Sequence, residues 1–271
     1  MTEAALAPNP VILSDRAAKK IGRVLAKQPE GTVLRDGIRQ VAQLTKRPFG
    51  VNLNLQYPQE EWLEVSIDEG VGAVSLFWGL SESMIRRARD AGMLVIQTVG
   101  SAAEARQAIE LGAEIIIAQG WEAGGHVWGK VGTLALVPAV VDAAGPIPVI
   151  AAGGIADGRG LAAALALGAS GAWIGTRFLL AHEATLDPDR SDVIRNASEA
   201  DTVMGKDANP SWLDSAIRWI GGEAPESYRP AGSQLAGQGV GLVKRQQPAA
   251  EIVAEIWAEA KATMTNLSEM R

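Results

Sequence analysis

The sequence of 271 residues contains no cysteine, so disulfides, thiolate metal sites and thiol nucleophiles are all excluded. It also lacks any run of about 18 consecutive apolar residues, and we therefore expect no membrane-spanning helix. The stretch MTEAALAPNPVILSDRAAKK has no basic segment ahead of an apolar one, so we expect no secretory signal peptide. These absences together predict a cytoplasmic protein.

Positive charge and histidine are also scarce. The chain has 25 Lys and Arg against 31 Asp and Glu, a formal net charge of −6. Nucleic-acid and anionic-membrane binders need a basic face, so we expect neither partner. Two histidines and no cysteine provide too few ligands for a zinc site. No G-x-S-x-G stretch is present, which argues against a serine hydrolase.

The chain does contain an alternation of short apolar runs with helix-period segments. The runs rich in β-branched residues are FGVNLNL (49–55), VGAVSLFW (71–78), MLVIQTV (93–99), EIIIAQG (114–120), IPVIAAGG (147–154) and GAWIGT (171–176). Segments 81–92 and 101–113 each open on a serine and close near a glycine, as helices prefer. Continuously apolar strands that alternate with helices predict a parallel sheet covered by helices.

Such a sheet is either a closed (β/α)₈ barrel or an open doubly wound sheet. Polar and glycine residues recur at the ends of many strands, which favours the barrel, whereas an open sheet gathers them at one switch point. We predict a single α/β barrel domain over residues 1–271. Residues 183–236 are predicted to form a less regular insertion of helix and loop, followed by a closing amphipathic helix over 248–264.

Two glycine turns follow consecutive late strands. Gly153 and Gly154 lie between the strand PVIAA and a helix that opens near Asp157, and the next strand ends in IGTRF. Backbone N–H groups in such turns, with a helix N-terminus behind them, bind anions. The glycines alone could equally close tight turns. Two such turns in succession favour a phosphate site, with Thr176 as a further donor.

The stretch AQGWEAGGHVWG (118–129) places a histidine on a glycine-rich loop after a strand. Gly124 and Gly125 allow close approach of a ligand, and His126 can accept or donate a proton near neutral pH. The alternative is a solvated loop histidine. We interpret His182, in a charged helical region without such glycines, as structural. Trp78, Trp121 and Trp128 could line a site for an aromatic cofactor or apolar substrate, or simply pack.

The same strings, AQGWEAGGHVWG and PVIAAGGIADGRGLAAALALGASGAWIGTRFLLAHEA, closely resemble the nitronate monooxygenase family, formerly called 2-nitropropane dioxygenases. LTKRPFGVNLNL and AGQGVGLVKRQQPAAEIVAEI are also similar to that family. The resemblance covers roughly residues 32–182 and 231–262. It implies an FMN-dependent (β/α)₈ barrel, related to FMN-dependent enoyl-acyl carrier protein reductases, that oxidises alkyl nitronates or nitroalkanes with O₂.

The resemblance also implies site residues. His126 matches the active-site histidine of the family, which assists proton transfer or binds the substrate anion. The positions that match cofactor contacts are Asn52, Gln119, Gly124, Gly125, Gly153, Gly154, Trp173, Ile174, Gly175 and Thr176. The implied partners are a small-molecule substrate and O₂, and the oligomeric state is left open. An enoyl-thioester reductase and a non-catalytic flavin-binding barrel remain alternatives.

The sequence departs from the family at two places. Thr98 stands where several members carry a lysine. Residues 9–37 are too short and too polar to supply the first strand, helix and second strand of the family, so we expect a shortened or rebuilt N-terminal strand. The segment 21–26 could replace the second strand, and residues 8–14 could rebuild the first.

Overall fold

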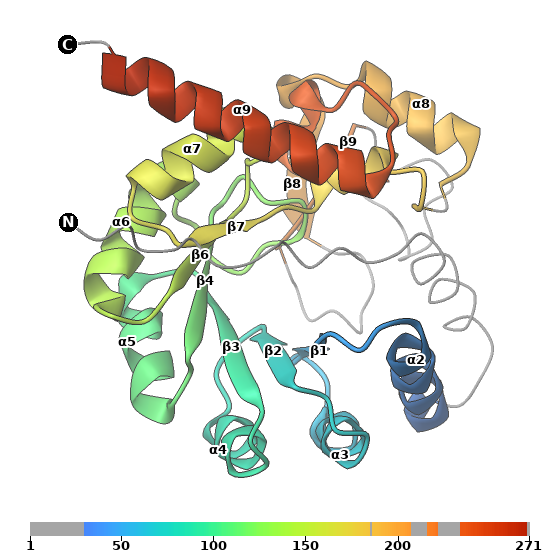
Figure 1. Ribbon diagram of the computed structural model, residues 1–271, viewed down its shortest axis with the longest axis vertical. Helices are drawn as coiled ribbons and strands as arrows, with labels where there is room; N and C mark the ends of the chain where they lie inside the picture. The colour runs from blue at the N-terminus through green and yellow to red at the C-terminus, as the bar shows by residue number, and fades with distance from the viewer. Residues whose placement is uncertain (1–29, 185, 207–215, 222–233, 270–271) are drawn as a thin grey trace.

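A parallel sheet of six strands organises the computed structural model, which describes residues 30–184, 186–206, 216–221 and 234–269. The strand order is β1-β2-β3-β4-β6-β7, so successive parallel strands are neighbours (Figure 1). These strands are β1 (Gly50–Asn54), β2 (Ala73–Phe77), β3 (Leu94–Val99), β4 (Ile115–Gln119), β6 (Val149–Ala152) and β7 (Gly171–Trp173).

Helices connect these strands and cover one face of the sheet. They are α2 (Glu30–Leu44), α3 (Glu60–Asp68), α4 (Glu82–Asp90), α5 (Ala102–Leu111), α6 (Thr133–Ala144) and α7 (Gly158–Ala166). The predicted caps are present: Ser81 accepts a hydrogen bond from Met84 N, and Ser101 accepts one from Glu104 N. Local sequence signals therefore fixed these helix starts, because the cap satisfies a backbone N–H that the helix leaves unpaired.

The two faces of the sheet differ in the residues they carry. Val74, Leu76 and Val95 pack against the helices in the main hydrophobic core. The alternate residues point to the other face, where Asn52 pairs in register with Ser75 and Ser75 with Ile96. A sheet with its helices on one face and its strands in sequential order has the arrangement of a (β/α)₈ barrel.

The predicted α/β barrel-type fold is confirmed in class and in strand order. Among the described residues no pairing joins β7 to β1. The segments 8–14 and 21–26, which we expected to rebuild the first strands, lie outside the described residues. Helix α2 was not predicted from the sequence.

The region 183–236 contains α8 (Pro188–Asn196), β8 (Thr202–Lys206) and β9 (Ala216–Ile220), and the three-residue turn η2 (Glu199–Asp201). Strand β9 pairs antiparallel with β8, with β10 (Gln234–Leu235) and with β5 (Gly125–His126), and so forms a second sheet. This sheet was not predicted. It brings β9 against the loop that carries His126. The division of the chain into domains stays a prediction.

The C-terminal helix α9 (Ala249–Glu269) packs along α7 and follows the turn η4 (Gln238–Leu242), as Figure 1 shows. It confirms the predicted closing helix. The turn η1 (Thr176–Leu180) follows β7. No helix of the described ranges is long and apolar enough to cross a membrane.

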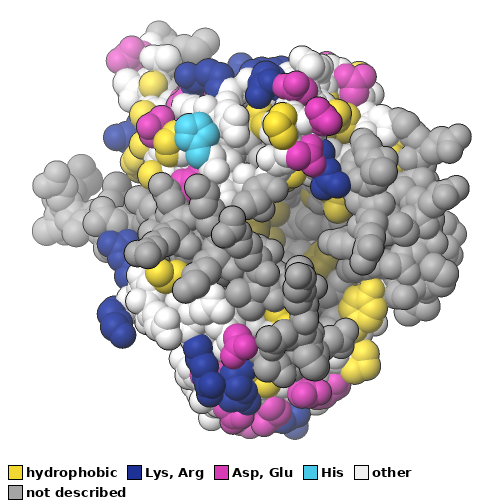
Figure 2. All heavy atoms as spheres, turned by 90° about the vertical axis from the view of Figure 1, so that its right-hand side faces the viewer, with side chains coloured by type: hydrophobic (Ala, Val, Ile, Leu, Met, Phe, Trp, Pro, Cys, Tyr) yellow, Lys and Arg dark blue, Asp and Glu magenta, His cyan; other side chains and the backbone are white. Residues whose placement is uncertain are grey.

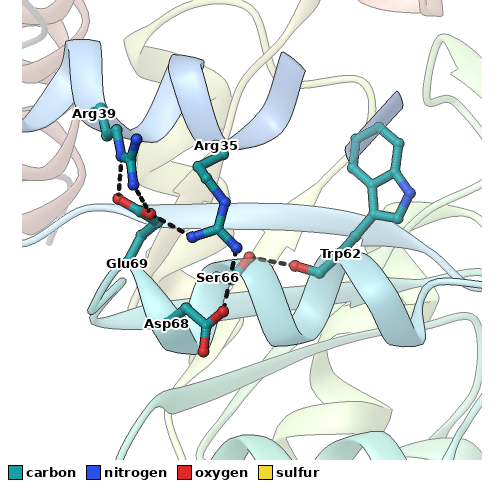
Figure 3. A network of polar contacts seen from close by, with 6 residues as sticks. All are labelled: Arg35, Arg39, Trp62, Ser66, Asp68 and Glu69. Atoms are coloured by element: carbon teal, nitrogen blue, oxygen red, sulfur yellow. Dashed lines mark hydrogen bonds and ion pairs between the residues drawn. The ribbon is translucent and has the colours of Figure 1, made fainter. Parts of the chain in front are cut away.

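An arginine network joins α2 to α3 at the β1 end of the sheet (Figure 3). Arg39 donates to both carboxylate oxygens of Glu69 at 2.8 Å, and Arg35 donates to Glu69 Oε1 at 2.6 Å and to Asp68 Oδ2 at 3.2 Å. The hydrogen bonds from Arg39 and then from Arg35 lower the pKa of Glu69, although burial opposes this change. Bidentate contacts of this kind fix the orientation of α2.

Candidate functional site

A cavity of about 350 Å³ lies at the carboxyl ends of β4, β6 and β7. This is the edge of the sheet where α/β barrels assemble their sites. Eight of the residues predicted to contact a cofactor line it: Gln119, Gly124, Gly125, Gly153, Gly154, Trp173, Gly175 and Thr176. On the face shown in Figure 2, the surface is hollowed near its middle, and acidic and basic side chains are intermingled among the described residues.

The turn after β6 requires both of its glycines. Gly153 and Gly154 have φ angles of 98° and 73°, in the left-handed region that residues with a Cβ rarely adopt. A Cβ on Gly153 would also lie 2.9 Å from the carbonyl oxygen of Gly120. The conformation thus explains these glycines without a ligand, while the same turn borders the cavity.

Carboxylates cap the N-terminus of α7, the helix end whose dipole we expected to support an anion at the glycine turn. Asp157 accepts a hydrogen bond from Gly160 N at 3.0 Å, and Glu259 of α9 accepts one from Gly158 N at 2.7 Å. Two carboxylates therefore already occupy backbone donors of this helix end. The N–H groups of Gly158 and Gly160 are therefore already paired, and the turns before them are the part of this region that borders the cavity.

The turn after β7 is open to the cavity. Gly175 has ordinary negative φ of −107°, and a Cβ built on it would meet no atom within 4 Å. The hydroxyl of Thr176 accepts a hydrogen bond from Gly237 N at 2.9 Å and can still donate its own hydrogen. This turn therefore offers backbone and hydroxyl donors beside an empty space.

The loop after β4 carries His126. Its Gly124 is required by protein packing rather than by a ligand alone, because a Cβ there would lie 2.2 Å from Gly237 N. The side-chain amide of Gln119 binds the backbone of the loop at His126 and Trp128. Its Nε2 donates to the His126 carbonyl at 3.2 Å, and its Oε1 accepts from Trp128 N at 2.9 Å. Gln119 thus lines the cavity and positions the histidine.

Three aromatic rings gather at the loop that carries His126. The rings of Trp78 and His126 are perpendicular with centroids 5.8 Å apart, and those of Trp78 and Trp128 are 5.2 Å apart. Trp128 Nε1 donates to Glu104 Oε2 at 2.8 Å. Trp78 has a φ of 76°, a strained conformation for a residue with a side chain. His126 is half-buried and adjoins the lining residue Gly125 without lining the cavity itself.

Two residues that were predicted to contact the cofactor lie outside the cavity. Asn52 is exposed on the face of β1 opposite the core, and Ile174 packs against the hydrophobic core. Neither lines the cavity, and their roles stay predictions. His182 is exposed, and its backbone N–H bonds to the Gln247 carbonyl. The described residues contain no group of three or more His, Asp or Glu side chains suited to a metal.

Sequence reasoning missed the polar residues behind the site. The carboxylate of Glu122 accepts hydrogen bonds from Thr133 N at 2.9 and 3.0 Å. The Thr133 hydroxyl lies 2.8 Å from Glu122 Oε2 and 2.9 Å from the Gly153 carbonyl, and so links the histidine loop to the glycine turn. Arg218 of β9 contacts the same loop. Glu122 lies within the stretch 118–129, but no local motif assigns a role to these three residues, because their partners lie on other segments of the chain.

The fold and the cavity define a protein of the α/β barrel class, with a cavity at the carboxyl ends of its strands. The chain belongs to the nitronate monooxygenase family, since a sequence model of that family matches residues 24–210. The resemblance inferred from the two long glycine-containing strings is thereby confirmed.

Relatives and solved structures show the range of this similarity. The chain is 43% identical over 177 residues to a Rhodococcus jostii 5-hydroxy-7a-methyl-1-oxo-octahydro-1H-indene-4-carboxyl-CoA dehydrogenase, covering 65% of this chain and 50% of that protein. FabK from Thermotoga maritima matches with a TM-score of 0.81 and 33% identity over 93% of this chain and 89% of that one. A nitroalkane oxidase from Streptomyces ansochromogenes matches with a TM-score of 0.77 and 26% identity, covering 88% and 87%. The chain spans half or less of the length of three of the curated relatives that it matches, from 41% to 50%.

Proposed function

We propose that this chain is a flavin-dependent oxidoreductase that binds FMN in the cavity at β4, β6 and β7 and oxidises alkyl nitronates or nitroalkanes with O₂. The observation that carries the proposal is the cavity itself, which lies between two successive glycine turns and adjoins the His126 loop. Membership of the nitronate monooxygenase family and the likeness to a nitroalkane oxidase support it.

The residues present fit an FMN phosphate and ring. The volume of about 350 Å³ falls within the range of roughly 300–1,000 Å³ typical of small-molecule sites. The Gly153–Gly154 turn and the Gly175–Thr176 turn present backbone to the cavity, where N–H groups can hold a phosphate. Trp173 lines the same cavity with 51% of its surface exposed and offers a flat apolar surface to a ring.

The chemistry divides between cofactor and chain. When bound, FMN supplies the electron transfer and the reaction with oxygen. His126 accepts the α-proton of a neutral nitroalkane, or holds the negative charge of a nitronate. Trp78 packs edge-to-face against the imidazole, and Trp128 packs in turn against Trp78. Gln119 fixes the loop through its bond to the His126 carbonyl.

Cofactor identity tests the proposal most directly. We expect purified protein, after incubation with excess FMN and desalting, to show a flavin absorbance spectrum. The cofactor released by heat should run with FMN on chromatography, and FAD offered in parallel should be retained less. Retention of FAD in preference to FMN, or no flavin retained at all, would contradict the proposal.

Gly175→Leu should weaken FMN binding by at least about tenfold, or 1.4 kcal/mol, because its side chain would enter the open space beside the phosphate turn. Gly154 is a poorer probe, since its φ of 73° makes any side chain strained. The matched control is Gly37→Leu on α2, where a Cβ also meets nothing within 4 Å. Fluorescence titration with FMN gives both dissociation constants. Equal affinity in the two variants would place the phosphate elsewhere.

An enoyl-thioester reductase is the second candidate, favoured by the likeness to FabK and to a carboxyl-CoA dehydrogenase. It would use a nicotinamide donor rather than a nitronate. Oxidation of NADH or NADPH that depends on an enoyl thioester, together with inactivity on nitronates, would select this candidate over the first.

A further inference from the structure

A buried arginine lies behind the histidine loop. Arg218 of β9 is only 3% exposed. Burial lowers the pKa of its guanidinium, and the nearby Glu122 carboxylate acts in the opposite direction. A buried guanidinium is costly unless its donors are satisfied, so its placement calls for a specific set of acceptors.

Two of the acceptors are backbone carbonyls of the histidine loop, and a third is the hydroxyl of Thr202 on β8, 3.4 Å from Nη1. Arg218 Nη2 donates to the Trp121 carbonyl at 2.9 Å, and Nε donates to the Ala123 carbonyl at 3.2 Å. The guanidinium carbon also lies 5.8 Å from the centroid of the Trp121 ring, within reach of a cation–π contact. One side chain therefore holds two points of the loop that leads into Gly124 and His126.

The backbone of the same strand holds the end of the loop. Arg218 pairs in register with Gly125, Ile217 pairs with His126, and Val127 N donates to the Ala216 carbonyl at 2.9 Å. Side chain and backbone of β9 thus fix the loop on both sides of Gly124. The backbone on both sides of the imidazole is therefore held by this strand, whose Arg218 lies 95 residues from Ala123 in sequence.

We propose that Arg218 is the positioning residue of the His126 loop and sets where the imidazole lies relative to the cavity. The expected effect of Arg218 on turnover rests on the proposed function, whereas its expected effect on the position of His126 does not. Lysine cannot replace it, because a single ammonium lacks the planar fork that reaches two carbonyls at once. Arg218→Met and Arg218→Lys should therefore both displace the loop, the first more than the second.

The two histidines of the chain make the displacement measurable without cofactor or substrate. In protein labelled with ¹⁵N-histidine, His182→Gln assigns the imidazole signals of His182, and the remaining set belongs to His126. We expect Arg218→Met to shift or broaden the His126 signals and to leave those of His182 in place. The control is Arg106→Met, an exposed arginine on α5, which should move neither set.

A residue that merely stabilises the fold would lower the melting temperature and leave the His126 signals of the native protein unmoved. That result in folded Arg218→Met protein would overturn the proposal. If Arg218→Met does not fold, Arg218→Lys decides the question by the same spectrum, since it keeps the buried charge and loses the second carbonyl contact.

Turnover gives the functional consequence. With nitronate as substrate, we expect kcat/KM of Arg218→Lys to fall by about 10–100-fold, the cost of a misplacement near 1 Å. FMN affinity should stay close to that of the parent protein, because Arg218 does not line the cavity. Undiminished kcat/KM in a variant with shifted His126 signals would contradict the catalytic consequence. A parent protein inactive on nitronates would refute the proposed function, and the histidine spectrum would still decide the role of Arg218.

Discussion

His126→Ala should retain bound FMN and lose turnover by about 10²–10⁴-fold, the usual contribution of a positioned acid or base. The cofactor should remain because His126 adjoins the cavity without lining it. Stopped-flow absorbance of the flavin and oxygen-uptake assays measure the loss of turnover. The control is His182→Ala, whose side chain is exposed and should be dispensable.

Two substrates separate the possible roles of His126. A neutral nitroalkane still carries its α-proton and needs a base, whereas a pre-formed nitronate does not. Loss confined to the nitroalkane would identify the histidine as a base. Loss on both would show that it positions or stabilises the anion. A variant that turns over both substrates like the parent protein would refute any catalytic role for His126.

Gln97→Leu should lower the free energy of unfolding by about 1–3 kcal/mol, the cost of leaving buried polar groups unpaired. Gln97 is fully buried, and its Nε2 lies 3.1 Å from the Leu76 carbonyl, 2.9 Å from the Gly79 carbonyl and 2.9 Å from the Thr98 carbonyl. Leucine has nearly the same size and removes these bonds. Chemical denaturation measures the change, and Gln107→Leu, at an exposed position of α5, is the control.

Gln97 Nε2 contacts the carbonyls at both ends of the strained turn between Leu76 and Gly79. Trp78 has a φ of 76° there, and its ring packs on His126. Glycine adopts the left-handed conformation without strain, so in Trp78→Gly the turn depends less on the hydrogen bonds from the Gln97 side-chain amide. The effect of Gln97→Leu should therefore be smaller in the Trp78→Gly background. Equal effects in both backgrounds would show that Gln97 stabilises the fold without supporting the turn.

The sequence predicted the elements that depend on neighbouring residues. The apolar runs of β1, β2, β3, β4, β6 and β7 and the serine caps of α4 and α5 act over one turn or one strand, so their signals are local. The Gly153–Gly154 turn was found for the same reason. The family resemblance was carried by continuous strings, which is why eight residues that line the cavity at β4, β6 and β7 could be named in advance as candidates.

Tertiary structure alone decided what holds these residues in place. Arg218 reaches the Trp121 carbonyl across 97 positions, and Glu259 caps α7 across 101 positions. Gly124 is needed because the chain folds Gly237 against it. Such contacts depend on where β9 and α9 pack relative to the six-stranded sheet, and no pattern of neighbouring residues predicts that packing. The sequence by itself determined the strands of the six-stranded sheet and the family, and packing between distant segments determined the geometry of the candidate site.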